Sequence, residues 1–214
     1  SFHPAIKFNR HFKSILFACL IAAICFLVWD AWFTANGIWG FNEKYIIGIK
    51  LFNLPLEEIL FFFCIPFACV FTYHCLTNFF NIKWPAKIEA VFIFLFCILL
   101  FITGIKNFQK DYTATTFIST GILLIILKSI FRVTWLSKIF SIYPILLIPF
   151  FIVNGILTGS GLEQPVVWYN NAENLGIRIL TIPVEDIIYG LELILLTLFF
   201  YEKFKPFDNK IKQF

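Results

Sequence analysis

Six long apolar runs, separated by short segments that carry most of the charges and turn residues, organise the chain. Each run holds roughly 20 residues, the length that an α-helix needs to cross the hydrocarbon core of a membrane. Helices of a soluble protein would show a polar face, and these runs show none. The pattern predicts an all-α fold, a polytopic membrane helix bundle with about six transmembrane helices at 13–33, 54–78, 86–105, 113–131, 139–157 and 182–202.

Composition and charge agree with this prediction. The 214 residues are 60% hydrophobic and only 14% charged, which is unlike a soluble domain. With a cytoplasmic N-terminus, twelve of the 17 Lys and Arg residues fall on the inner side and five on the outer side. This asymmetry follows the positive-inside rule and predicts a multi-pass protein of the cell inner (cytoplasmic) membrane with both termini cytoplasmic. The same bias explains the net charge of +4, so we expect no nucleic-acid partner.

An internal repeat emerges when the chain is compared with itself at an offset of 128 residues. The segments FNEKYIIGIKLFNLPLEEILF (41–61) and YNNAENLGIRILTIPVEDIIY (169–189) share six identities, concentrated on polar and special residues. The two copies lie an even number of spans apart, so they point the same way across the membrane. We therefore expect a single integral membrane domain, 1–214, with parallel repeats at approximately 13–78 and 139–202 joined by a helical hairpin, 86–131.

Each copy places two adjacent carboxylates at the entrance of an apolar run, Glu57 with Glu58 and Glu185 with Asp186. A purely structural interpretation exists, because proline and carboxylates both suit the first turn of a helix. Two copies at matching positions favour a functional interpretation, because ionisable groups inside a membrane are costly. Neighbouring residues are about 100° apart around a helix. We expect Glu57 and Glu185, which are identical in the two copies, to face a common cavity.

Further polar and aromatic residues are expected near this cavity. Glu192 follows the second carboxylate pair on the same helical face, where it either shares a proton or pairs with a neighbouring helix. Asp30 and Asn154 each lie near the outer end of a span. Trp29 and Trp168 belong to the cavity wall or to an interfacial aromatic belt. The supporting candidates are Asp30, Asn154, Trp29, Trp168, Asn170, Arg178 and Glu192.

These residue types together suit one kind of chemistry. A neutral carboxyl group in a water-poor cavity is a proton donor, and its conjugate base can take a proton back. Aromatic faces attract cations. The combination fits protonation of an alkene, guidance of a carbocation and removal of a proton. All six cysteines lie in predicted spans without a CxxC or Cys/His cluster, so we expect no metal site.

The motifs PLEE at 55–58 and PVED at 183–186 resemble those of the membrane-integral lycopene cyclases. The WD of the first span and the GI-x-x-x-x-[LI]-P-x-E-[ED] block in both halves extend this resemblance over most of the chain. The family comprises two-subunit bacterial cyclases, fused single-chain relatives, which this chain is most similar to, and the cyclase domain of fungal cyclase–phytoene synthases. The resemblance implies a redox-neutral isomerisation, an intramolecular lyase reaction, of lycopene to β-carotene through γ-carotene.

The resemblance also implies a mechanism. An acid protonates C2 of the terminal C1=C2 bond, the C5=C6 bond attacks the cation at C1, and loss of the C6 proton completes a β-ionone ring. No strand–GxGxxG–helix motif is present, and the membrane type is expected to work without flavin or any other cofactor. The implied partners are a carotenoid dissolved in lipid and the membrane lipid itself, and an oligomer is compatible with the sequence. The candidate acid and base groups are Glu57, Glu58, Glu185 and Asp186.

Other functions stay open. A cyclase of the same family that forms ε-rings or acts on C50 carotenoids differs in which proton leaves or in substrate length. A small proton-coupled membrane transporter also uses repeats and buried carboxylates. Here, however, the carboxylates cluster at one surface, and we expect only the fifth span to be interrupted, by Pro144 and Pro149. A membrane prenyltransferase would need aspartate-rich magnesium motifs, which the sequence lacks.

Overall fold

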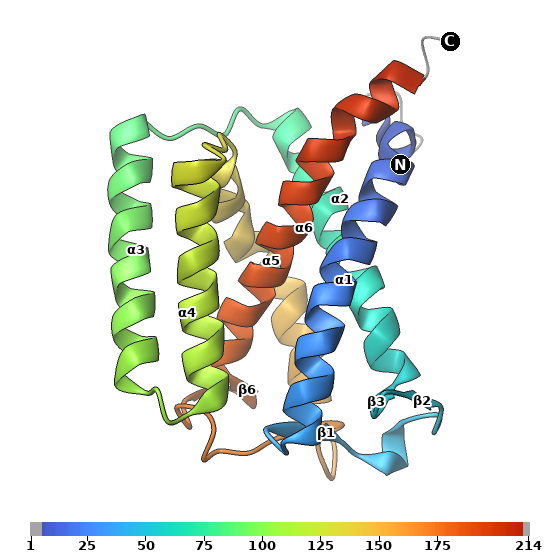
Figure 1. The fold of residues 1–214 in the computed structure, drawn as a ribbon. Helices are drawn as coiled ribbons and strands as arrows, with labels where there is room; N and C mark the ends of the chain where they lie inside the picture. The colour runs from blue at the N-terminus through green and yellow to red at the C-terminus, as the bar shows by residue number, and fades with distance from the viewer. Residues whose placement is uncertain (1–5, 212–214) are drawn as a thin grey trace.

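Six long helices form a bundle in the computed structural model, which describes residues 6–211, with side chains up to residue 205 (Figure 1). Both ends of the described chain lie at one end of the bundle, and the short strands lie at the other. The predicted all-α class is confirmed. The helices are α1 (Phe12–Ala35), α2 (Leu56–Phe79), α3 (Ala86–Lys106), α4 (Asp111–Ile125), α5 (Leu136–Leu157) and α6 (Val184–Ile211).

Short elements connect the helices. Two 3₁₀ turns span Phe8–His11 and Glu43–Tyr45, and a π-helical turn, Ile126–Ile130, follows α4. Three antiparallel two-stranded ribbons, β1–β4, β2–β3 and β5–β6, lie at the end of the bundle opposite the chain ends. Their strands are β1 (Trp39–Phe41), β2 (Lys50–Leu51), β3 (Leu54–Pro55), β4 (Val167–Tyr169), β5 (Arg178–Ile179) and β6 (Ile182–Pro183).

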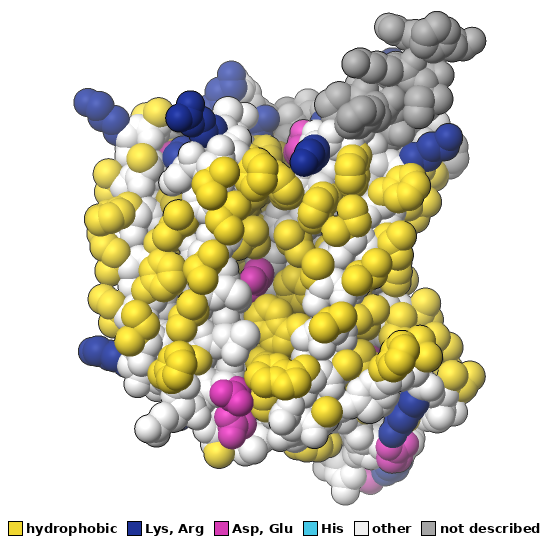
Figure 2. All heavy atoms as spheres, in the orientation of Figure 1, with side chains coloured by type: hydrophobic (Ala, Val, Ile, Leu, Met, Phe, Trp, Pro, Cys, Tyr) yellow, Lys and Arg dark blue, Asp and Glu magenta, His cyan; other side chains and the backbone are white. Residues whose placement is uncertain are grey.

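An apolar belt covers the visible face of the bundle, with charged side chains mostly toward its two ends (Figure 2). Large hydrophobic side chains are turned outward on several helices. Val28, Phe94 and Ile152, for example, are 69%, 64% and 63% exposed. Such an extended apolar surface is unfavourable in water and matches the acyl chains of a bilayer. The chain is a multi-pass membrane protein.

The central helix of the bundle is α6. Among the described residues, α1 to α5 are long and apolar enough to cross a membrane. The 28 residues of α6 extend about 42 Å, and α6 contacts α1, α2, α4 and α5. Its run contains Glu185, Asp186 and Glu192, all buried in protein. The predicted sixth span, 182–202, is therefore enclosed by other helices, which explains how it accommodates three carboxyl groups.

Prolines do not interrupt the helices. Contrary to the expectation from the sequence, α5 continues through Pro144 and Pro149, and α2 likewise contains Pro66. Each proline lacks the N–H that would bond the carbonyl four residues earlier. These helices are therefore continuous but locally less restrained.

The ribbon β1–β4 joins the two loops that precede α2 and α6. A Cβ atom at Gly40 would overlap the indole ring of Trp168, so the close approach of the two strands requires glycine. Gly40 and Trp168 are 128 positions apart, and the pairs on either side of them are exchanged by the same offset, so the register is locally two-fold symmetric about this central pair. The repeat as a whole, over 13–78 and 139–202, stays a prediction. The register pairs Trp39 with Tyr169, Gly40 with Trp168 and Phe41 with Val167.

Candidate active site

The same type of hairpin leads into both α2 and α6. The strands β2 and β3 lie 128 positions before β5 and β6, and both turns contain a residue with positive φ, 50° at Phe52 and 58° at Leu180. Pro55 immediately precedes the first residue of α2, one position earlier than the expected first helical position. Its fixed φ sets the direction in which the chain enters the helix. The two carboxylate pairs therefore begin from matching backbone positions.

The first carboxylate of each pair binds the loop that precedes its helix. The Ile47 N–H donates to Glu57 Oε1 at 2.6 Å, and the Leu175 N–H donates to Glu185 Oε1 at 2.8 Å. The Thr113 hydroxyl of α4 also donates to Glu185 Oε1, at 2.6 Å. A loop N–H outside regular secondary structure needs an acceptor other than a helix or strand carbonyl. Glu57 and Glu185 therefore hold the loops against the helix entrances.

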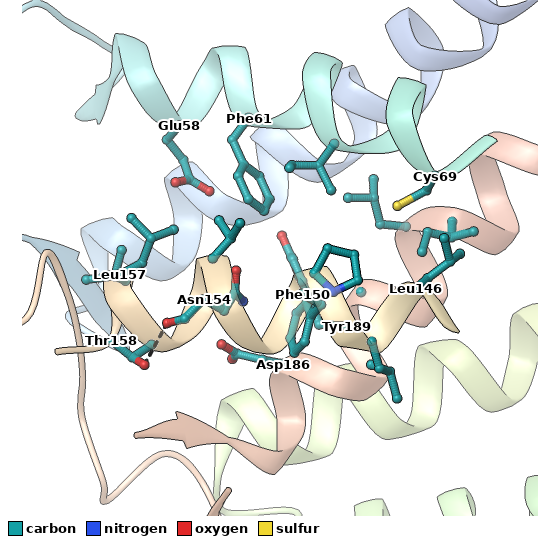
Figure 3. A pocket seen from close by; sticks show the side chains of 18 of the residues that line it. Glu58, Phe61, Cys69, Leu146, Phe150, Asn154, Leu157, Thr158, Asp186 and Tyr189 are labelled. Atoms are coloured by element: carbon teal, nitrogen blue, oxygen red, sulfur yellow. Dashed lines mark hydrogen bonds between the residues drawn. The ribbon is translucent and has the colours of Figure 1, made fainter. Parts of the chain in front are cut away.

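The second carboxylate of each pair faces a cavity of about 190 Å³ between α2, α5 and α6. Glu58 from α2 and Asp186 from α6 point into the same space (Figure 3). The expectation that Glu57 and Glu185 face the cavity is wrong, because the loop N–H groups bind these two side chains. The shared cavity itself was correctly expected, but the member of each pair that lines it was not.

Asp186 is the most strongly bound carboxyl group of the cavity. The Tyr112 hydroxyl donates to Asp186 Oδ1 at 2.6 Å, and the Tyr169 hydroxyl donates to Asp186 Oδ2 at 2.8 Å. Burial raises the pKa of Tyr169 well above its ordinary value, and the charge of Asp186 acts in the same direction. Tyr169 thus remains a hydrogen-bond donor. Two donors on two oxygens favour the carboxylate form of Asp186.

Asp30 and Glu58 have fewer partners. The Trp39 indole N–H donates to Asp30 Oδ1 at 2.6 Å, whereas Asp30 Oδ2 is buried without a hydrogen-bond partner in the described part of the chain. Within residues 6–211, the side chain of Glu58 makes no hydrogen bond. Asn154 also lines the cavity. The cavity therefore combines one carboxyl group with donors on both oxygens, one with a single donor, and one with none.

Glu192 lies outside this cavity, on the side of α6 that faces α4. It accepts hydrogen bonds from Ser119 at 2.8 Å and Thr120 at 3.0 Å. Glu185 also bonds α4, through Thr113, so Glu185 and Glu192 share a helical face as the sequence predicted. Of the two expected roles, Glu192 adopts the pairing with a neighbouring helix.

The two tryptophans proposed as supporting residues lie outside the cavity. Trp168 is 43% exposed and covers Gly40. Trp29 packs edge-on against the Tyr189 ring, with ring centroids 5.3 Å apart, and its buried indole N–H has no acceptor among the described residues. Tyr189 lines the cavity, so Trp29 packs against a cavity residue on the side away from the cavity.

Asn170 and Arg178 organise the loop that precedes α6. Asn170 Oδ1 accepts from the Ala172 N–H at 3.0 Å, which stabilises a turn just after β4. The Arg178 guanidinium donates to the Thr181 carbonyl at 2.7 Å and lies 5.7 Å from the centroid of the Tyr169 ring. Arg178 therefore packs on the back of a tyrosine whose hydroxyl binds the cavity carboxylate.

Sequence reasoning missed the four tyrosines that line the cavity, Tyr112, Tyr143, Tyr169 and Tyr189. Tyr189 follows Asp186 by three positions, a spacing that places both on one helical face, and this signal was available. Tyr169 was visible only as the counterpart of Phe41 in the repeat. Tyr112 gave no signal, because its contact with α6 joins segments that are far apart in the sequence. Its hydroxyl and the indole of Trp39 are nevertheless two of the cavity's main donors.

The part of the chain that the structure describes contains no group of three or more His, Cys, Asp or Glu side chains suited to hold a metal ion. The polar groups that line the cavity include carboxyl, hydroxyl, amide and indole groups, surrounded by apolar side chains from α2, α5 and α6. Groups of these types can donate, accept and hold protons. The arrangement suits acid–base chemistry on an apolar molecule.

A family model described as lycopene cyclase matches residues 1–76 and 109–204. The chain belongs to the lycopene cyclase family. The unmatched segment between the two blocks contains α3, which packs mainly against α4 at the edge of the bundle and contributes no residue to the cavity. Both cyclase-family blocks, in contrast, contribute carboxyl groups to it. Cyclases of this family are isomerases in chemical class, since ring closure only rearranges bonds.

Several fungal relatives of this cyclase-family chain are bifunctional lycopene cyclase/phytoene synthases. The protein of Leptosphaeria maculans is 40% identical over 48 residues, that of Phaeosphaeria nodorum 35% over 49 residues, and that of Arthroderma gypseum 35% over 48 residues. Each alignment covers 22% or 23% of this chain and 8% of the relative. No solved structure matches the chain.

The hydrogen bond between Thr113 and Glu185 generates a stability prediction. Replacing Thr113 with Val removes a donor to a fully buried carboxylate, so we expect the free energy of unfolding to fall by about 1–3 kcal/mol. Thermal unfolding of the purified protein in detergent measures this loss. Thr116→Val is the matched control: Thr116 is equally buried on α4, and its hydroxyl has no partner among the described residues. Equal effects of the two changes would contradict the assigned role of Glu185.

Proposed function

We propose that this protein is a lycopene β-cyclase that closes the end groups of lycopene by acid–base catalysis without redox change. Family membership supports the substrate class. The observation that carries the proposal is the cavity, in which Glu58 and Asp186 face an otherwise largely apolar and aromatic space from two helices. A linear hydrocarbon offers no polar group to bind, so apolar contacts and a proton donor are what its recognition requires.

Glu58 is the proposed proton donor. A carboxyl group without a hydrogen-bond donor in an apolar cavity is more stable as the neutral acid, and Glu58 is such a group. Its proton goes to C2 of the terminal C1=C2 bond, which leaves a tertiary cation at C1. The electron pair of the C5=C6 bond then forms the C1–C6 bond and transfers the positive charge to C5. The aromatic rings of Phe61 and Tyr189 line this space and stabilise a passing cation.

Asp186 is the proposed base. The Tyr112 and Tyr169 hydroxyls favour its carboxylate form, which attracts the cation and accepts the C6 proton, so that the C5=C6 double bond of a β-ring forms. One proton is given and one is taken, and the product is an isomer of the substrate. The proton must then return from Asp186 to Glu58 before the next cycle. Removal of a different proton would give an ε-ring, so the position of the base relative to C6 determines the ring type.

Expression in a bacterium that accumulates lycopene tests the function directly. We expect the red pigment to become yellow-orange, and chromatography of the extract to show β-carotene with γ-carotene as the intermediate. An ε-ring product would retain the cyclase chemistry and refute the β assignment. Unchanged lycopene in cells with abundant, membrane-inserted protein would refute cyclisation and favour a transporter.

The orientation of the carboxylates predicts different effects for the two members of each pair. Glu58→Gln and Asp186→Asn should each reduce cyclisation at least about 100-fold, because general acid–base catalysis contributes that much or more. Glu57→Gln and Glu185→Gln are the matched controls, since the amide oxygen of Gln still accepts from the loop N–H. These controls should cyclise within a few-fold of the wild type at equal protein amounts. Loss of activity in the controls with retention in Glu58→Gln would reverse the assignment.

We also propose that the protein lies in the inner (cytoplasmic) membrane of the cell, and that the end of the bundle with both ends of the described chain faces the cytoplasm. Twelve of the 17 Lys and Arg residues belong to segments assigned to that side, as the positive-inside rule requires. Green fluorescent protein joined to residue 214 should therefore fluoresce, whereas alkaline phosphatase at the same position should be inactive. The opposite pair of results would invert the topology and place the cavity's acidic end on the cytoplasmic side.

A further inference from the structure

The wall of the cavity is continuous with the outer surface of the bundle. Ala68 of α2 and Pro149 and Val153 of α5 line the cavity and are also exposed at the surface, Val153 by 42%. These three residues come from the two helices that flank the cavity. The cavity therefore has a lateral opening between α2 and α5, in the apolar belt of the protein.

The cavity is long and narrow. Its lining residues on α2 run from Glu58 to Thr72, a helical distance of about 21 Å. Those on α5 run from Tyr143 to Leu157, also about 21 Å along the helix. This length covers some two-thirds of the hydrocarbon core of a bilayer. A rod-shaped apolar molecule fits such a slot better than a compact one does.

The carboxyl groups occupy only one end of the slot. Asp30, Glu58 and Asp186 lie near the strand end of the bundle, where β1 and β4 contribute Trp39 and Tyr169 to the wall. The opposite half is lined mostly by apolar side chains of α2, α5 and α6. A molecule that reaches the carboxyl groups from the membrane must therefore come through the lateral opening, because the ribbon covers the acidic end.

The helix α5 is suited to border such an opening. Pro149 lines the slot and leaves the carbonyl of Ile145 without its helical N–H donor, which lowers the resistance of α5 to bending at this level. In the opposite wall, Pro66 of α2 does the same for the carbonyl of Phe62. Both helices that border the opening therefore contain an internal proline.

We propose that a linear polyene enters sideways from the bilayer between α2 and α5, through a portal bordered by Ala68, Pro149 and Val153, and lies along the slot with one end group at Glu58 and Asp186. The polyene as occupant rests on the proposed cyclase function. The apolar lining, the length of the slot and the placement of the carboxyl groups at one end select an extended hydrocarbon over a polar solute.

Narrowing the portal tests its role. Val153→Trp and Ala68→Phe should each slow conversion of lycopene at least about tenfold in membranes with equal protein content. Ile152→Trp is the matched control, because Ile152 neighbours Val153 on α5, is 63% exposed and does not line the slot. The control should convert lycopene at the wild-type rate. Unchanged conversion by both portal variants would overturn the portal and leave the cyclase function intact.

Binding separates the portal from catalysis. Glu58→Gln protein, purified from lycopene-containing membranes, should retain the pigment, as measured by its visible absorbance per protein. Adding Val153→Trp should remove most of this pigment, and adding Ile152→Trp should not. Pigment retained by wild-type protein without conversion would refute the cyclase function and support the portal, provided that Val153→Trp abolishes retention. Retention of phospholipid alone would overturn the polyene as occupant.

Discussion

A carboxyl group inside an apolar bundle either receives hydrogen bonds or remains protonated, and the structure depends on how this constraint is met at each position. Glu185 and Glu192 accept hydrogen bonds from hydroxyl groups of α4 and thereby hold α6 against α4. Asp186 accepts hydrogen bonds from two tyrosine hydroxyls, one on α4 and one in β4. Glu58 receives none. The helix α4 thus supplies hydrogen-bond donors to three acids of α6, whereas no hydrogen bond to the Glu58 side chain is found within residues 6–211.

This difference gives two similar helix entrances different chemical characters. The hairpins before α2 and α6 hold the first carboxylate of each pair by the same backbone contact, so the second carboxylates reach the cavity from equivalent positions. Beyond that point the halves diverge, because Asp186 meets Tyr112 and Tyr169 whereas Glu58 meets apolar space. The proposed acid and the proposed base thus face one cavity with unequal numbers of hydrogen-bond donors. Catalysis by proton exchange needs such an inequality, which two identical environments would not provide.

The sequence was sufficient to predict the membrane-spanning helices, because a run of about 20 consecutive apolar residues has few other interpretations. It also located the carboxylate pairs and Asp30 and Asn154 near one cavity. The member of each pair that faces the cavity was assigned wrongly. Glu57 and Glu185 are identical in the two copies because both bind a loop N–H group, and the next residue along a helix points about 100° away. Tyr112 was beyond reach because its partner Asp186 lies 74 positions away, and helix packing alone brings the two together.

The covered acidic end of the slot bears on the composition of the pigment that such an enzyme makes. A symmetric polyene can present only one terminus per visit, so a two-ringed product requires the half-finished molecule to leave, reverse and return. The number of rings per product molecule then depends on whether the one-ringed intermediate is bound again by the enzyme or diffuses away in the lipid. The same chain would enrich one-ringed pigment when fresh substrate is abundant and two-ringed pigment when it is scarce.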